Sequence, residues 1–229
     1  MMKQESGSRD YVLAQLLAER HSCRAFRPDP VPRATVEAIL AMAQRTASWC
    51  NAQPWQVHVL SPEATTRVRE ELVAFARTHA PQPDFDFPGA YEGVYLDRRR
   101  ECGLQLYAAT GVQRGDKAAY ERQWLENYRL FGAPQVAIVS SHAPLGTYAA
   151  IDCGAYVHNF MLAAWSLGVA SIAQAAQAAV AGFWRERLAL PEDRKVVCGI
   201  AFGFEDAGHP ANAFRTARAE VGDAVQWVE

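Results

Sequence analysis

The sequence lacks the features that would place it at once among nucleic-acid-binding or membrane proteins. Its 229 residues carry a formal net charge of −2, so there is no surplus of basic residues to attract nucleic acid or an anionic membrane. Its longest apolar stretch, residues 148–184, is interrupted by polar residues such as Asp152, His158 and Gln174. A membrane-spanning helix needs about 20 mostly apolar residues. We therefore expect no nucleic-acid partner and no membrane span.

Cysteine is scarce, and the arrangement of the cysteines argues against a metal site and a disulfide framework. The chain has no CxxC pair, and none of its six histidines lies at zinc-ligand spacing from a cysteine. An odd, scattered set is typical of free thiols in a reducing cytosol, and the start MMKQESGSRDY has no apolar segment of a secretory signal. We expect a cytoplasmic protein without a metal. The five cysteines are Cys23, Cys50, Cys102, Cys153 and Cys198.

What the chain does have is enough apolar material for one large core. Half of the residues are hydrophobic, and single cores grow to roughly 250 residues before they split into domains. Helices and strands are predicted without regular βαβ alternation, which indicates an α+β fold, and no GxGxxG motif of a Rossmann dehydrogenase follows a strand. The predicted helices are residues 10–19, 32–43, 63–79, 95–128 with a break near 111–116, and 148–167. The predicted strands are residues 55–60, 134–140, 169–172 and 195–204, with loops at 80–94 and after 172 and a strand-like end at 224–228.

Two groups of arginines, near opposite ends of the chain, are candidates for binding an anion. Arg20 and Arg24 flank Ser22 in the segment RHSCR, and Arg215 and Arg218 lie in the tail. The forked guanidinium group matches the geometry of a phosphate, which it can bind with two parallel hydrogen bonds. The alternative is an exposed helix end followed by a basic surface tail, because cations also favour helix C-termini.

Two further segments combine polar or small residues at the ends of predicted elements. The turn SWCNAQPW supplies hydrogen-bonding groups from Ser48, Asn51 and Gln53, and Pro54 favours an extended conformation before the next strand. The segment LGVASIAQAA, residues 167–176, is rich in small residues that let another group approach the backbone. Each has a structural alternative, a polar connection and tight helix–strand packing respectively.

Taken together and in this order, these segments resemble the nitroreductase family of FMN-dependent oxidoreductases. The resemblance covers essentially the whole chain, and YLDRRRECGLQLYAATGVQRGD with the following FGAPQVAIV resembles the nitrobenzoate and nitroaromatic reductase subgroup. It implies a single FMN-binding domain over residues 1–229, with a central, mostly antiparallel sheet flanked by helices. It also implies an intertwined homodimer with FMN sites at the subunit interface, a long core helix at 151–167 and a C-terminal arm, 205–229, that reaches the partner.

The resemblance also assigns cofactor contacts residue by residue. The segment with Arg20, Ser22 and Arg24 would bind FMN at its phosphate, ribityl chain and ring edge, and the tail arginines would close the phosphate site. The turn at 48–53 would usually come from the partner subunit, and residues 173–176 would lie beside the flavin ring. Many relatives have proline where this chain has Ala173, which leaves backbone donors in place but removes local rigidity. The implied cofactor-binding residues are Arg20, His21, Ser22, Arg24, Ser48, Trp49, Asn51, Gln53, Ala173, Gln174, Ala175, Arg215 and Arg218.

The implied activity is a two-electron, ping-pong transfer from NAD(P)H to a nitroaromatic or quinone-like planar substrate. The chemistry belongs to the flavin, so no side chain is assigned a catalytic role. Residues 85–131 are expected to cover the pocket, although most of their aromatic rings could equally fill the core. Other flavin chemistry on the same scaffold (dehydrogenase, dehalogenase or flavin-consuming enzyme) and a non-catalytic flavin-binding protein remain alternatives. The pocket candidates are Tyr91, Tyr107, Trp124, Tyr128 and Phe131.

Overall fold

A computed structural model describes residues 7–229 of the chain. Of the N-terminal stretch in which no secretory signal was found, residues 1–6 lie outside the described residues. No helix within 7–229 is long and apolar enough to cross a membrane. The five cysteines are free thiols, as the sequence predicted.

One antiparallel sheet organises the fold. Its strands are β1 (Trp55–Leu60), β2 (Gln135–His142), β3 (Ala170–Gln174) and β4 (Arg194–Gly203), in the spatial order β1-β2-β4-β3. Every neighbouring pair is antiparallel. In the two central strands, residues 135–141 of β2 and 199–203 of β4 are buried throughout, because helices cover both faces of the sheet there. The predicted α+β class and antiparallel sheet are confirmed.

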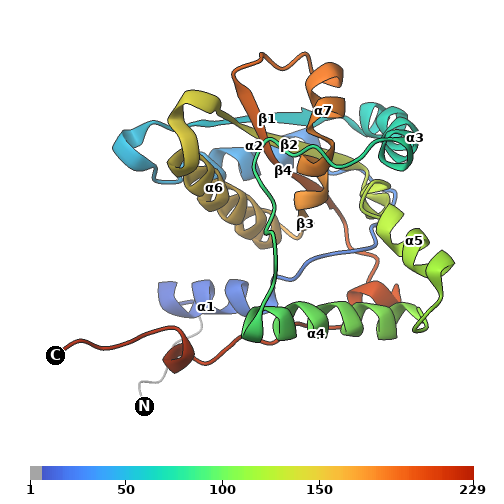
Figure 1. Cartoon of the computed structure of the whole chain (residues 1–229). Helices are drawn as coiled ribbons and strands as arrows, with labels where there is room; N and C mark the ends of the chain where they lie inside the picture. Colours follow the sequence, from blue (N-terminus) through green and yellow to red (C-terminus); the bar gives the residue numbers. More distant parts are fainter. Residues whose placement is uncertain (1–6) are drawn as a thin grey trace.

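The helices divide between the two faces of the sheet. On one face α2 (Arg33–Ala43) and α6 (Gly146–Ser166) pack against β2 and β4 and bury Ile39 and Phe160. On the other face lie α3 (Pro62–Thr78), α5 (Lys117–Leu125) and α7 (Ala181–Arg187), which bury residues such as Trp184. In Figure 1 the sheet lies between these two groups. The helix predicted at 148–167 thus exists as α6, shifted by one or two residues at its ends.

A third group of elements lies outside this packed body. It consists of α1 (Arg9–Glu19), α4 (Gly93–Thr110) and the tail from residue 213, and Figure 1 shows them together below the sheet. Neither α1 nor α4 has a buried side chain. The apolar stripe predicted for the first helix is exposed at Leu13 and Leu17. We call α1, α4 and residues 213–229 the outer layer.

Two sequence predictions about secondary structure are wrong. The loop expected after the third strand is instead a 3-10 helix, Ala175–Val180, followed by α7, because its alanines and aromatic residues are buried against the sheet. The strand-like end at 224–228 is irregular and follows a 3-10 turn, Val221–Asp223. Its Trp227 and Val228 are 86% and 96% exposed, and no strand within residues 7–229 pairs with this segment.

Candidate functional site

The two arginine groups, far apart in the sequence, line one cavity. Its volume is about 280 Å³, and it lies where α1, the segment after it, α4 and the tail meet. A phosphate group is small enough for such a space, and guanidinium groups are its preferred partners. The lining residues are Leu17, Ala18, Arg20, His21, Ser22, Arg24, Cys102, Phe214, Arg215, Thr216 and Arg218.

Backbone pairing with the sheet positions the first arginine group. Arg20 ends α1, where its N–H donates to the Leu16 carbonyl at 3.0 Å. The chain then runs beside β3, because Ser22 forms a parallel bridge with Ser171. The next N–H, of Cys23, donates to the Ser171 carbonyl at 3.1 Å. The segment carrying the arginines therefore joins the end of α1 in the outer layer to the edge strand of the sheet.

Asn212 fixes the tail to this segment, a role that the sequence did not suggest. Its Oδ1 accepts from the Arg24 N–H at 2.6 Å, across 188 residues of sequence. Its Nδ2 donates to the carbonyls of Ala25 and Asp206 at 2.9 and 3.0 Å. An asparagine this buried has its hydrogen-bonding capacity met only in one geometry, so it determines where the tail arginines begin.

His21 adds a second connection between the same two segments. Its Nε2 lies 2.9 Å from a carboxylate oxygen of Glu205, and its Nδ1 lies 3.0 Å from the Glu19 carbonyl oxygen. The ring also packs edge-on against Trp165 of α6, with ring centres 5.2 Å apart. Both ring nitrogens of His21 thus lie within hydrogen-bond distance of oxygens of the chain, while the residue also lines the cavity.

The arginines of the cavity are not neutralised by the chain itself. Among residues 7–229, Arg20, Arg24, Arg215 and Arg218 form no ion pair with a carboxylate. Three of them donate to backbone or hydroxyl oxygens, as Arg215 does to the Asn212 carbonyl at 2.7 Å. Burial lowers the pKa of Arg20 and Arg24, and the like charge of Arg218 lowers that of Arg20 further. An anion in the cavity would relieve this unfavourable concentration of positive charge.

The end of β3 presents small exposed residues beside two anchored glutamines. Ala173 and Ala175 are exposed, whereas Gln174 and Gln177 are buried. Both glutamines donate from Nε2 to the carbonyl of Asn127, each at 2.8 Å. This shared acceptor ties the backbone of β3 to the end of α5, a link between distant segments that sequence reasoning missed.

The side-chain amide of Gln177 is held in one orientation, whereas the side-chain oxygen of Gln174 has no hydrogen-bond partner among residues 7–229. The indole N–H of Trp184 donates to Gln177 Oε1 at 3.1 Å, which fixes the direction of that amide. A Cβ at Gly199 would lie 2.5 Å from Gln177 Cγ, so the glycine leaves room for the side chain. Oε1 of Gln174 is buried without a hydrogen-bond partner among residues 7–229. A donor from outside the described chain would complete it.

The turn at 48–53 lies apart from the arginine cavity and is strained. None of its residues lines the cavity, and Trp49, Asn51 and Gln53 are exposed. Cys50, Asn51 and Gln53 have φ angles of 51°, 55° and 46°, a left-handed region that residues other than glycine rarely adopt. Such strain persists only where neighbours hold it, and it is concentrated at functional sites.

Helix α6 is one of the neighbours that hold the turn. The Asp152 carboxylate accepts from the Trp49 N–H at 3.2 and 3.3 Å, and Tyr148, one helical turn away, contacts the Trp49 ring with centres 4.6 Å apart. Within the turn, the Ser48 hydroxyl accepts from the Gln53 N–H at 2.9 Å. Ser48 and Trp49 therefore hold the turn in its conformation, while the side chains of Asn51 and Gln53 are exposed on its surface.

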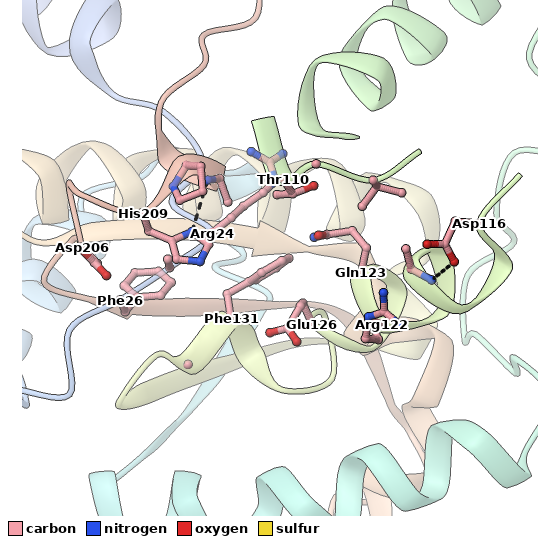
Figure 2. Close-up of a pocket in the computed structure, with 17 residues that line it drawn as sticks. Arg24, Phe26, Thr110, Asp116, Arg122, Gln123, Glu126, Phe131, Asp206 and His209 are labelled. Carbon is pink, nitrogen blue, oxygen red and sulfur yellow. Dashed lines mark hydrogen bonds between the residues drawn. The ribbon is translucent and has the colours of Figure 1, made fainter. Parts of the chain in front are cut away.

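A second cavity, of about 540 Å³, is lined in part by the Arg24–Phe26 segment. Figure 2 shows Arg24, Gln123 and Phe131 around it, so it shares Arg24 with the first cavity. Of the five aromatic pocket candidates, only Phe131 lines it.

The other aromatic candidates lie in different surroundings. Tyr128 is 3% exposed and belongs to the core, where Trp124 packs against it with ring centres 4.9 Å apart. Tyr107 packs on Tyr120, and Tyr91 is exposed beneath the guanidinium of Arg99. A single chain thus does not gather these rings into one pocket.

The fold and the cavity define an α+β protein in which arginines from both ends of the chain line one cavity. Comparison with known proteins identifies the family to which the chain belongs. Residues 17–204 match the model of the nitroreductase family, and the chain belongs to that family. The resemblance inferred from the sequence is confirmed, and the chain is an oxidoreductase of this type.

Named relatives match over nearly their whole length. A nitroreductase, NfnB, from Mycolicibacterium smegmatis is 36% identical, with 93% of this chain and 91% of the relative covered. A 4-nitrobenzoate reductase from Nocardioides sp. strain LMS-CY is 35% identical, with 88% and 84% covered.

Solved structures agree with the fold. The FMN-dependent nitroreductase NfnB from Mycobacterium smegmatis, in complex with NADPH, superposes with a TM-score of 0.92 at 33% identity, covering 97% of this chain and 100% of that one. The FMN- and NADPH-dependent NfnB from Sphigopyxis sp. strain HMH gives 0.90 at 32% identity, covering 94% and 98%.

Proposed function

We propose that this protein is an FMN-dependent oxidoreductase that uses NAD(P)H to reduce nitroaromatic or quinone-like planar substrates. The observation that carries the proposal is a set of four arginines around a cavity large enough for a phosphate, none of which pairs with a carboxylate among residues 7–229. Membership of the nitroreductase family and the names of the relatives support it.

The residues present fit the cofactor. Arg20, Arg24, Arg215 and Arg218 would hold the phosphate, and the Ser22 hydroxyl would donate to it. Exposed Ala173 and Ala175, with Gln174 between them, would bring backbone N–H groups to the ring edge, where they favour negative charge. When bound, FMN supplies the group that accepts a hydride and passes it on. The chain itself binds, orients and keeps water away.

The functional unit of the proposal is a homodimer of single-domain chains, each spanning residues 1–229. The outer layer, the ring of Trp49 and the start of α6 at Tyr148 expose apolar surface that a second copy would cover. The turn at 48–53 of one copy would then lie against the flavin of the other. The arm, 205–229, would extend from its own arginine site across the second copy.

Residues 85–131 cover the substrate pocket in this proposal. The loop before α4 is anchored by Asp84, whose carboxylate pairs with Arg185 at 2.7 Å and accepts from the Val196 N–H at 2.7 Å. Beyond this anchor, Tyr91 is exposed, and Tyr107 and Trp124 lie on the two helices that follow. These rings and Phe131 would offer flat surfaces to a planar substrate once two copies meet.

The absorbance spectrum of the purified protein tests the proposal. We expect a yellow protein with the bands of oxidised flavin, which bleach when NADH or NADPH is added without oxygen. The more effective nucleotide would also identify the electron donor. A colourless protein that takes up no added FMN would overturn the proposal.

A further inference from the structure

A chain of side-chain amides runs from the core to the strained turn. The indole N–H of Trp55 donates to Oε1 of Gln44 at 3.0 Å, and Nε2 of Gln44 donates to Oε1 of Gln53 at 3.0 Å. Nε2 of Gln53 in turn donates to Asn51, to both Oδ1 and the backbone carbonyl, at 3.2 Å. These four residues form a directed series of hydrogen bonds, which we call the amide relay.

The direction of the relay is fixed at both of its ends. The indole of Trp55 can only donate, and its ring is 9% exposed and packed on Tyr156 with centres 5.0 Å apart. At the other end, the backbone carbonyl of Asn51 can only accept. Reversing either glutamine amide would place two acceptors or two donors face to face. The two glutamine orientations therefore follow from their neighbours.

The relay determines the orientation of the side-chain amide of Asn51. Because Oδ1 of Asn51 accepts from Gln53, its Nδ2 is the end left to face outward. No residue of 7–229 accepts a hydrogen bond from this Nδ2, and Asn51 is exposed on a turn held in a left-handed conformation. The relay thus makes Asn51 a hydrogen-bond donor toward whatever the turn meets.

We propose that Gln44 is a positioning residue that sets Asn51 as a donor toward the acceptor atoms of the flavin bound by a second copy. The proposal rests on the proposed function, which brings the turn to that flavin. The flavin ring carries carbonyl oxygens, and negative charge gathers there when the ring is reduced. A fixed donor stabilises that charge, and exclusion of water at the interface strengthens the interaction. Gln44 touches no reactant and acts only through Gln53 and Asn51.

The substitution Gln44→Glu tests the relay with almost no change in shape. A carboxylate still accepts from the Trp55 indole but cannot donate to Gln53. Because a charged acceptor binds a donor more strongly than a neutral carbonyl does, Nε2 of Gln53 turns toward Glu at this position. Asn51 must then donate to Gln53 and present its oxygen outward. We expect FMN to dissociate about tenfold more readily and the flavin midpoint potential to become more negative.

Two matched variants separate the relay from simpler effects. Gln44→Met removes the hydrogen bonds without adding charge, and we expect a smaller loss because the Asn51 carbonyl still orients Gln53. Ala47→Glu places the same charge on a neighbouring exposed residue outside the relay, and we expect the affinity and potential of the unaltered protein. If Gln44→Glu does no more than Ala47→Glu, the relay has no such role and the inference is overturned.

Asn51→Ala distinguishes failure of the inference from failure of the site assignment. We expect weaker FMN binding and a more negative potential in this variant. If Asn51→Ala has the FMN affinity and the flavin midpoint potential of the unaltered protein, the turn does not contact the flavin. That result would contradict both the assignment of the turn to the flavin site and the role of Gln44. If Asn51→Ala has the expected effect while Gln44→Glu has none, only the inference falls.

Discussion

The packed body and the outer layer of this molecule differ in how their apolar residues are used. In the body, both faces of the sheet are covered, and Ile138, Phe160 and Phe202 are wholly buried. In the outer layer, two helices of 11 and 18 residues bury no side chain at all. A helix without a buried face gains little from tertiary packing, so a layer built this way needs another surface. The arginine cavity lies at the junction of the two regions.

The largest effect should come from the body. Phe160→Ala removes a ring that packs edge-on against Phe202 at 5.6 Å and has no route to solvent. We expect the free energy of unfolding to fall by about 3–5 kcal/mol, the range for deleting a buried aromatic ring. Urea unfolding would measure it. Leu104→Ala on α4, an exposed position, is the control and should cost far less in a single chain.

A loss below about 1 kcal/mol for Phe160→Ala would contradict the division between the regions, because typical core truncations exceed that value. Equal losses for both variants would contradict it as well. They would mean that the outer layer is as tightly packed as the sheet.

The next largest effect is expected at the arginine cavity, where the packed body and the outer layer meet. Arg218→Ala removes a guanidinium that borders the cavity and faces Arg20 as a like charge. We expect FMN binding to weaken by about 1.5–3 kcal/mol, the contribution of a hydrogen bond to a charged group. Fluorescence titration of the apoprotein with FMN would measure this. Arg33→Ala, which breaks an exposed pair with Glu37, should leave FMN binding unchanged. If Arg218→Ala binds FMN as tightly as the unaltered protein, the assignment of Arg218 to the FMN phosphate is wrong.

The sequence predicted the body well because its signals are local. Residues 55–60 form β1 as predicted, and the remaining strands and long helices differ by a few residues at their ends. Apolar spacing and turn residues suffice for such elements. The same reasoning failed at residues 175–187 and 224–228, where burial or its absence decides the conformation.

The candidate site was predictable only in part. Its arginines were found from the sequence because guanidinium chemistry is conspicuous, but no spacing rule brings Arg24 next to Asn212. Asn212, Gln177 and Gln44 were missed, since each acts through contacts with residues chosen by the fold. An asparagine or glutamine in the sequence does not reveal its partner.

A smaller effect should distinguish the outer layer from the body. Trp227 in the tail is almost fully exposed, yet tryptophan is among the residues that contribute most to protein interfaces. We expect Trp227→Ala to weaken the proposed dimer about tenfold, the effect of roughly 1.4 kcal/mol, with no change in the unfolding of the body. Sedimentation at several concentrations would measure the dimer. Val59→Ala, on the edge strand β1, should leave the dimer intact. A monomer that retains its flavin would contradict the shared site.

The smallest effect concerns Asp152, which links the body to the exposed turn. Asp152→Ala removes the acceptor of the Trp49 N–H, and we expect about 0.5–1.5 kcal/mol of lost FMN affinity, the net contribution of one hydrogen bond. The loss arises because the left-handed residues after Trp49 relax when their anchor is gone. Asp152→Asn keeps one acceptor oxygen and should retain most of the affinity. Asp29→Ala, at an exposed surface pair with Arg27, is the control and should change nothing. If Asp152→Ala matches that control, the turn holds its conformation without help from α6, and the strain is balanced within residues 48–53 themselves.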